Sequence, residues 1–98
     1  MTRPNPIAIF SRVEGNEGWS LPHWRAELFD NPDGLGFMSR PVAIAYLTEY
    51  PADLGGPLLD YLIVFDDFRE MGYVLPLVRQ CRARFPRLRG TDRMRDDQ

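Results

Sequence analysis

The sequence predicts a small α+β domain in which two helices pack on a small antiparallel sheet. Two stretches, Pro41–Tyr50 and Leu58–Asp66, are rich in β-branched and aromatic residues, and a loop with prolines and paired glycines separates them. Apolar residues recur at helical spacing in two further stretches, Ser20–Asp30 and Tyr73–Phe85. A chain of 98 residues has room for about one domain, which we place at residues 1–90.

The first two elements are expected to be a strand and a short helix. Ile7–Glu14 is β-branched and aromatic, and the turn cluster Gly-Asn-Glu-Gly follows it. Ser20 is suitably placed to be a helix N-cap, with Pro22 in the first turn, where its missing N–H costs little. The i, i+3, i+7 spacing that predicts the helix is formed by Leu21, Trp24 and Leu28.

The middle of the chain is expected to form an antiparallel hairpin. A loop that begins at Asn31-Pro32, with a short strand at Gly36–Ser39, leads into its first strand. Both faces of the second strand are apolar around Ile63, a pattern typical of a strand that is covered on both sides. We therefore expect the strand around Ile63 to be the central strand of the sheet, paired with the strand around Ile44.

The last helix is expected over Tyr73–Phe85, with Pro86 as its stop. Residues 91–98 have almost no apolar content, which predicts a flexible tail. The apolar face of the helix consists of Val74, Leu77, Val78, Cys81 and Phe85.

The segment Leu58–Phe85 places a strand, an Arg-x-x-Gly turn and a helix in succession, with Arg69 and Gly72 as the turn residues. This segment resembles the acetyl-CoA-binding segment of the GCN5-related N-acetyltransferase (GNAT) family. In that family, backbone N–H groups at a helix N-terminus face the cofactor pyrophosphate, and the helix dipole favours its negative charge. The resemblance implies acetyl-CoA as cofactor, with these residues at the cofactor site: Phe65, Arg69, Gly72, Tyr73 and Val74.

Several features of the segment depart from the family's pattern. Val74 stands where the family has Gly or Ala and is expected to crowd the phosphates, Glu70 adds a negative charge, and Pro76 removes a backbone donor. The chain also stops near the point where the family adds another strand and helix. We therefore expect a GNAT-like binding or regulatory module without full acetyltransferase activity, with no catalytic residue assigned and with weak or no binding of acetyl-CoA. The alternative is that Gly72 is only the residue at which the chain enters the helix, and that the Arg69 side chain is solvated or ion-paired.

The arginines of the last helix suggest a second class of function. The chain has no lysine, and five arginines but no acid lie between Arg79 and Arg89. Such a face is either solvated or an anion-binding patch in which guanidinium groups contact phosphates. The net charge of −2 does not favour bulk binding of nucleic acid, so we expect no nucleic-acid partner.

A third class is a small homodimeric interaction protein, in which an exposed sheet edge pairs with another copy or with a protein partner. Other residues offer little chemistry, since His23 is the only histidine and Cys81 the only cysteine, and we expect no metal site. No apolar run approaches the ~20 residues of a membrane helix, and the N-terminus has no signal-length apolar run. We expect a cytoplasmic protein without a membrane partner.

Overall fold

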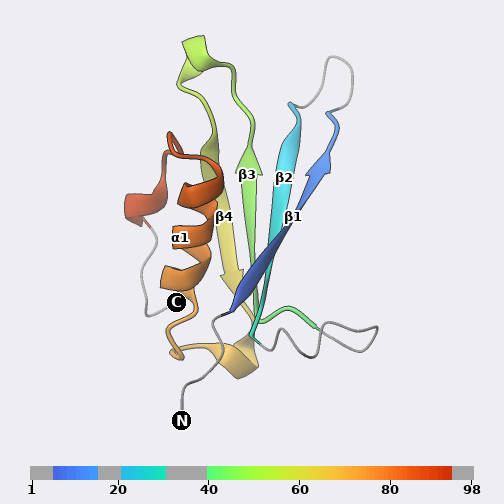
Figure 1. Ribbon diagram of the computed structural model, residues 1–98, viewed down its shortest axis with the longest axis vertical. Helices are drawn as coiled ribbons and strands as arrows, with labels where there is room; N and C mark the ends of the chain where they lie inside the picture. The colour runs from blue at the N-terminus through green and yellow to red at the C-terminus, as the bar shows by residue number, and fades with distance from the viewer. Residues whose placement is uncertain (1–5, 16–20, 31–39, 94–98) are drawn as a thin grey trace.

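A four-stranded antiparallel sheet with one helix on one of its faces forms the fold (Figure 1). The computed structural model describes residues 6–15, 21–30 and 40–93. The strands lie in the order β1-β2-β3-β4, each antiparallel to the next. The predicted α+β class is therefore confirmed, although the described residues contain one α-helix where two were expected. The elements are β1 (Ile7–Val13), β2 (His23–Phe29), β3 (Ala43–Thr48), β4 (Leu58–Val64) and α1 (Val74–Arg84).

Strand β2 occupies the stretch where sequence analysis predicts the first helix, so that prediction is wrong. The sequence of β2 also alternates in the manner of a strand: Ala26 and Leu28 are fully buried, while Arg25 and Glu27 alternate with them on the opposite face. Pairing with β1 on one side and β3 on the other gives its backbone groups hydrogen-bond partners on both edges. These pairings favour the strand over an isolated helix of similar length.

The predicted antiparallel hairpin of β3 and β4 is confirmed, and it contains a β-bulge. Tyr46 pairs with Tyr61 but Leu47 pairs with Leu59, so Asp60 is the extra residue. The bulge changes the alternation of β4, which allows both Leu59 and Leu62 to face the core.

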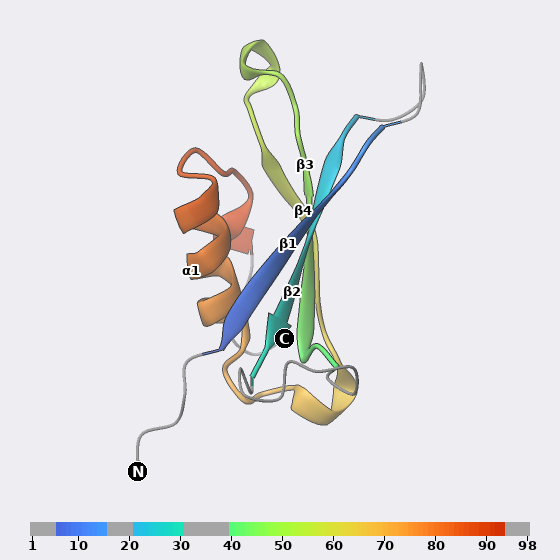
Figure 2. The same cartoon turned by 45° about the vertical axis from the view of Figure 1, so that its right-hand side comes forward.

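Strand β4 lies at the edge of the sheet, so the prediction that the strand around Ile63 is central is wrong. Ile63 is only partly buried, and β2 and β3 are the two central strands. Both faces of β4 are apolar because one face packs in the core beneath α1 and the other, with Tyr61 and Ile63, belongs to the partly apolar sheet surface opposite α1. Among the described elements, α1 covers only one face of the sheet (Figure 2).

The hydrophobic core lies between α1 and the sheet. The predicted apolar stripe of the helix is confirmed for Val74, Leu77, Val78 and Cys81, which are at most 7% exposed, while Phe85 is half-buried against the core. Phe85 also makes edge-to-face contacts with Phe10 and Trp24. The sheet contributes small and medium side chains beneath the helix, namely Ala26, Leu28, Ala43, Ala45, Leu47, Leu59, Leu62 and Val64.

Both edges of the sheet carry a contact from the C-terminal half of the chain. The Gln80 amide accepts a hydrogen bond from the Ala8 N–H (2.7 Å) and donates one to the Pro6 carbonyl (2.8 Å), as a neighbouring strand would. At the other edge, the Leu59 N–H donates to the Arg89 carbonyl (2.8 Å), and Arg89 forms a parallel bridge with Leu58. Each contact covers one end of an edge strand.

Two further predictions concern the ends and the loops. The predicted strand at Gly36–Ser39 lies outside the described residues. Thr91–Arg93 form a single 3-10 turn, η4, at the start of the predicted tail, and the rest of that tail lies beyond the described part of the chain.

Candidate functional site

The turn between β4 and α1 is the site that the sequence predicts. A 3-10 turn, η3 (Asp66–Phe68), follows Phe65 and is closed by a hydrogen bond from the Phe68 N–H to the Phe65 carbonyl (2.8 Å). The backbone then enters the left-handed region twice, at Glu70 (φ 65°) and at Gly72 (φ 80°). No atom outside its own chain neighbours lies within 4 Å of a Cβ built at Gly72, so its positive φ is the reason for glycine there.

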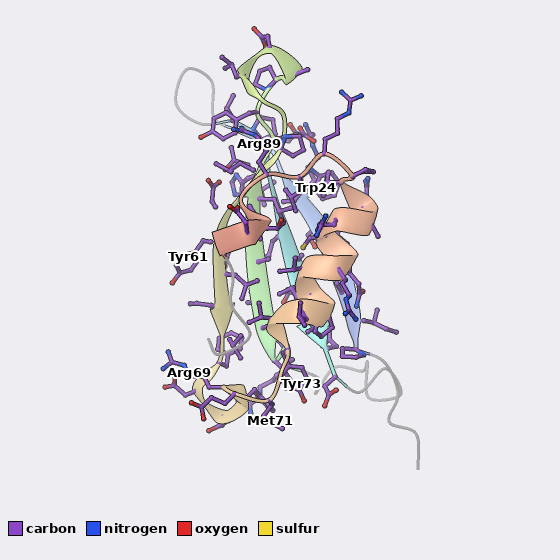
Figure 3. The ribbon with its side chains drawn as sticks, turned by 90° about the vertical axis from the view of Figure 1, so that its left-hand side faces the viewer. Trp24, Tyr61, Arg69, Met71, Tyr73 and Arg89 are labelled. Carbon is purple, nitrogen blue, oxygen red and sulfur yellow. The ribbon has the colours of Figure 1, made fainter. Side chains whose placement is uncertain are left out.

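The residues that the sequence assigns to a cofactor do not converge on one point. Arg69 is exposed, and its Nε lies 3.2 Å from Oδ1 of Asp66. Phe65 is 40% exposed and borders the face of the sheet opposite α1. Tyr73 is buried, and its hydroxyl donates a hydrogen bond to the Asp30 carboxylate (2.6 Å). Figure 3 shows Arg69 at the outer side of the turn and Tyr73 closer to the helix.

Val74 belongs to the core rather than to the turn surface. Its side chain is 1% exposed, so the expectation that it crowds bound phosphates is wrong. No side chain caps the N-terminus of α1, and Pro76 lies in the first helical turn, where proline is tolerated. The helix start thus offers the backbone N–H groups of Val74 and Leu75 to an anion. Two features oppose anion binding there, namely the ion pair of Arg69 with Asp66 and the negative charge of Glu70.

The arginines around the end of α1 divide into two groups. The Arg84 guanidinium stacks 5.0 Å from the rings of Trp24 and Phe85. Arg89 donates to the Gly56 carbonyl (3.1 Å), and a Cβ at Gly55 would come within 2.5 Å of its guanidinium carbon. These two arginines therefore serve the fold. The second group consists of Arg79, Arg82 and Arg87, which are exposed and form no ion pair with an acidic side chain among the described residues.

The only cysteine and the only histidine of the sequence lie among the described residues and are far apart in the chain, on α1 and β2. Cys81 is fully buried, and burial raises the pKa of its thiol to about 12, so the thiol is the stable form at neutral pH. His23 is half-buried at the start of β2. Within the described ranges, no three side chains of the metal-binding types gather closely enough to hold an ion. None of the helices in that part of the chain is long and apolar enough to cross a membrane.

A cluster around Glu49 should make stability depend on pH. The Glu49 carboxylate accepts hydrogen bonds from Arg12 (2.9 Å) and from the Trp24 indole (3.0 Å), and these bonds lower the pKa of Glu49 below its ordinary value of 4.5. A carboxyl group whose pKa is lower in the folded state stabilises the fold above its ordinary pKa, and this contribution is lost as the pH falls through the folded-state pKa.

We expect the substitution Glu49→Gln to destabilise the protein at pH 7 and to have little effect at pH 3. The Glu49 side chain is 34% exposed, so solvent screening should keep the loss at pH 7 to about 1 kcal/mol or less. Urea unfolding of both proteins at the two pH values measures the difference. A difference that is the same at pH 7 and pH 3 would show that the charge of Glu49 contributes nothing.

The sheet surface opposite α1 is the feature that sequence reasoning missed. We call it the open face, and its centre consists of two rows of side chains set by the strand register. One row crosses all four strands at the level of Glu27, and the other crosses them at the level of Arg25. In strand order, the first row is Ile9, Glu27, Ile44 and Ile63, and the second is Ser11, Arg25, Tyr46 and Tyr61.

Large apolar side chains on the open face are in contact with water. Ile9 is 42% exposed and Tyr61 is 52% exposed, and Figure 3 shows Tyr61 projecting from β4 away from α1. The Tyr46 and Tyr61 rings lie side by side with centroids 6.1 Å apart. Ile44, which lies between Glu27 and Ile63 in the first row, is only 6% exposed although it lies outside the core cluster.

A depression of about 570 Å³ lies on this face. Arg25, Glu27 and Ile44 form its floor, and the turn of Phe65 with η3 forms a rim. Arg25 and Glu27 make an ion pair at 3.4 Å across the floor. The depression thus combines apolar and charged side chains on a rigid sheet, which suits the recognition of another molecule.

Comparisons with protein-family models, with curated proteins and with solved structures found no match. The function therefore has to be argued from the geometry. Two features of the sequence are the signals that a search for this face needed, namely the alternation of Arg25 and Glu27 with apolar residues in β2 and the apolar character of both sides of β4.

Proposed function

We propose that this chain is a non-catalytic binding module and that its binding surface is the open face. The observation that carries this proposal is the exposure of Ile9, Tyr61 and Phe65, each at least 40% exposed on or beside one sheet face. The Tyr61 ring also lies next to the Tyr46 ring on this face, and exposed apolar side chains that lie together mark interaction sites on folded domains.

A partner that covers this surface removes apolar side chains from water. Burial of apolar surface contributes about 25 cal/mol per Å², so the stabilisation grows with the apolar area that the partner covers. Here α1 covers one face, and on the other face the rings of Tyr46 and Tyr61 and the side chains of Ile9 and Ile63 stand on rigid strands. Because their positions are fixed by the sheet, little conformational entropy is lost when a partner covers them.

Site-specific photo-crosslinking tests the proposal. A benzophenone amino acid in place of Tyr61 should form covalent adducts with another polypeptide in cells of the protein's own host. The matched control is the same replacement at Leu75, which is 44% exposed on the first turn of α1, in the other layer of the fold. Adducts from position 61 and none from position 75 are expected. Equal yields at both positions, or none at position 61, would contradict a binding role for the open face.

A GNAT-like cofactor segment is the second candidate, and the topology beside β4 favours it. The hairpin of β3 and β4 leads through Gly72 into α1, after which Arg89 returns beside Leu58 in the parallel sense. A strand that follows the helix and runs parallel to β4 is what the cofactor half of such a fold needs. Phosphates of acetyl-CoA would then meet the backbone N–H groups at the start of α1.

We expect calorimetry with acetyl-CoA and with CoA to show no binding tighter than about millimolar, equivalent to about −4 kcal/mol. The physical reasons are that Asp66 engages Arg69 and that Glu70 adds a negative charge near the phosphates. Micromolar binding that is lost in a Gly72→Val variant would reverse this expectation. The cofactor segment would then replace the open face as the primary site.

A further inference from the structure

We propose that the molecule that covers the open face is a second copy of this chain, related by a twofold axis that passes between Arg25 and Glu27. This inference rests on the proposed function, because it names the partner of the same surface.

The charges of Arg25 and Glu27 are placed so that two copies of the open face can pair them. Arg25 and Glu27 lie on the same side of central strand β2, two positions apart. A twofold axis parallel to the sheet, perpendicular to the strands and level with Ala26 places Arg25 of each copy opposite Glu27 of the other. Twofold contacts are reciprocal, so one axis forms two ion pairs.

The same charges disfavour neighbouring registers. An axis level with Arg25 would put the two copies of Arg25 opposite each other, and an axis level with Glu27 would do the same with the carboxylates. Opposed like charges in a closed interface are unfavourable. Of these three axes, only the one between the two residues pairs opposite charges across the sheet centre.

The apolar side chains fit the same axis. It lays the row that contains Ile44 and Ile63 over the row that contains Tyr46 and Tyr61 of the second copy. Aliphatic side chains then pack on aromatic rings on both sides of the axis, and the two sheets form a sandwich of the usual aligned kind.

The depression on the open face is filled in this arrangement. Its floor includes Glu27 and Ile44, which are the residues that the axis places beneath Arg25 and Tyr46 of the second copy. Two long side chains thus enter the volume of about 570 Å³ from above. By the twofold symmetry, Arg25 and Tyr46 of each copy occupy the depression of the other copy.

The size of the face sets the strength of the dimer. Four strands of about seven residues measure about 19 Å across and about 20 Å along, or about 400 Å² in flat projection. Protruding side chains make the accessible area larger than this projection, which brings it toward the lower end of stable interfaces at about 600 Å² per partner. A dimer of micromolar affinity is therefore expected.

Charge-exchange variants test the axis. The wild-type chain should be a dimer at about 100 µM in sedimentation equilibrium, and the variants Arg25→Glu and Glu27→Arg should each dissociate at least about tenfold more readily, since each faces its own like charges. An equimolar mixture of the two variants should form a heterodimer, and the double variant R25E/E27R should dimerise as the wild type does. Recovery in the mixture would show that the two positions face each other across the interface.

A further variant keeps the test decisive if a charge variant does not fold. Tyr61→Arg changes a side chain that is 52% exposed, so circular dichroism should show an unchanged fold while sedimentation shows a monomer.

The twofold arrangement would be overturned by any of three results. These are a monomeric wild type, single variants that are as dimeric as the wild type, and a mixture of the two variants that stays monomeric. Crosslinks from position 61 to a different polypeptide, together with a monomeric wild type, would overturn this inference and leave the proposed function standing. Absence of any crosslink from position 61 would overturn both.

Discussion

Replacing Leu77 by Ala is expected to lower the free energy of unfolding by about 2–5 kcal/mol. Leu77 is fully buried on the core side of α1, and removal of its side chain leaves a cavity between the helix and the sheet. Urea unfolding measures this loss directly.

The matched control is Ile63→Ala, which removes an aliphatic side chain from edge strand β4. Ile63 is only partly buried and lies on the open face, so its replacement should cost about 1 kcal/mol. Both unfolding curves should be recorded at low protein concentration, where association adds nothing to stability. Equal losses for the two variants would mean that the open face is as well buried as the core, which contradicts the one-sided sheet.

The sequence predicted the type of most elements but not which strands lie next to one another in the sheet. The β-branched runs of β1, β3 and β4 and the apolar stripe of α1 are properties of single segments, and all four elements were predicted. The stretch around Trp24 and Leu28 satisfied both a helical and an alternating spacing, and its pairing with β1 and β3 decided between them. Such pairing depends on distant parts of the chain, so periodicity alone could not choose.

The position of β4 shows a second limit. Apolar residues on both faces of a strand normally indicate cover on both faces, and the strand around Ile63 was placed at the centre of the sheet for that reason. The structure puts it at the edge with one face open. An edge strand with two apolar faces can therefore indicate a surface that another molecule covers. Ile63 belongs to such a surface, the open face, for which we propose a binding role. The bulge at Asp60 was equally beyond prediction, since it is defined only by the register with β3.

For the candidate turn, the sequence correctly placed a strand before it and a helix after it. The sequence supported two conflicting expectations for Val74, one on the apolar stripe of the helix and one beside bound phosphates. The structure agrees with the first, because Val74 lies in the core together with Leu77 and Cys81. Arg69 is ion-paired with Asp66, which was the alternative to a cofactor contact.

The second large effect is expected at Gln80, where Gln80→Glu should destabilise the protein by about 1–3 kcal/mol at pH 7. The Gln80 amide donates to the Pro6 carbonyl and accepts from the Ala8 N–H, so it holds edge strand β1 against α1. A carboxylate keeps the acceptor but loses the donor, and its charge then faces the Pro6 carbonyl oxygen.

The pH dependence of the Gln80→Glu variant separates this mechanism from a general loss of packing. A protonated glutamic acid regains a donor, so the new carboxyl group should be easier to protonate in the folded state than in the unfolded state, and its pKa should rise on folding. The deficit relative to wild type is then complete above the raised folded-state pKa and diminishes as the pH falls to the unfolded value of about 4.3. Urea unfolding of both proteins at pH 7 and pH 4 measures the deficit at each pH, and the wild type corrects for every other titrating group. A deficit of the same size at both pH values would show that the donor to Pro6 does not matter, and that β1 is held to the helix by the packing of Phe10 against Phe85.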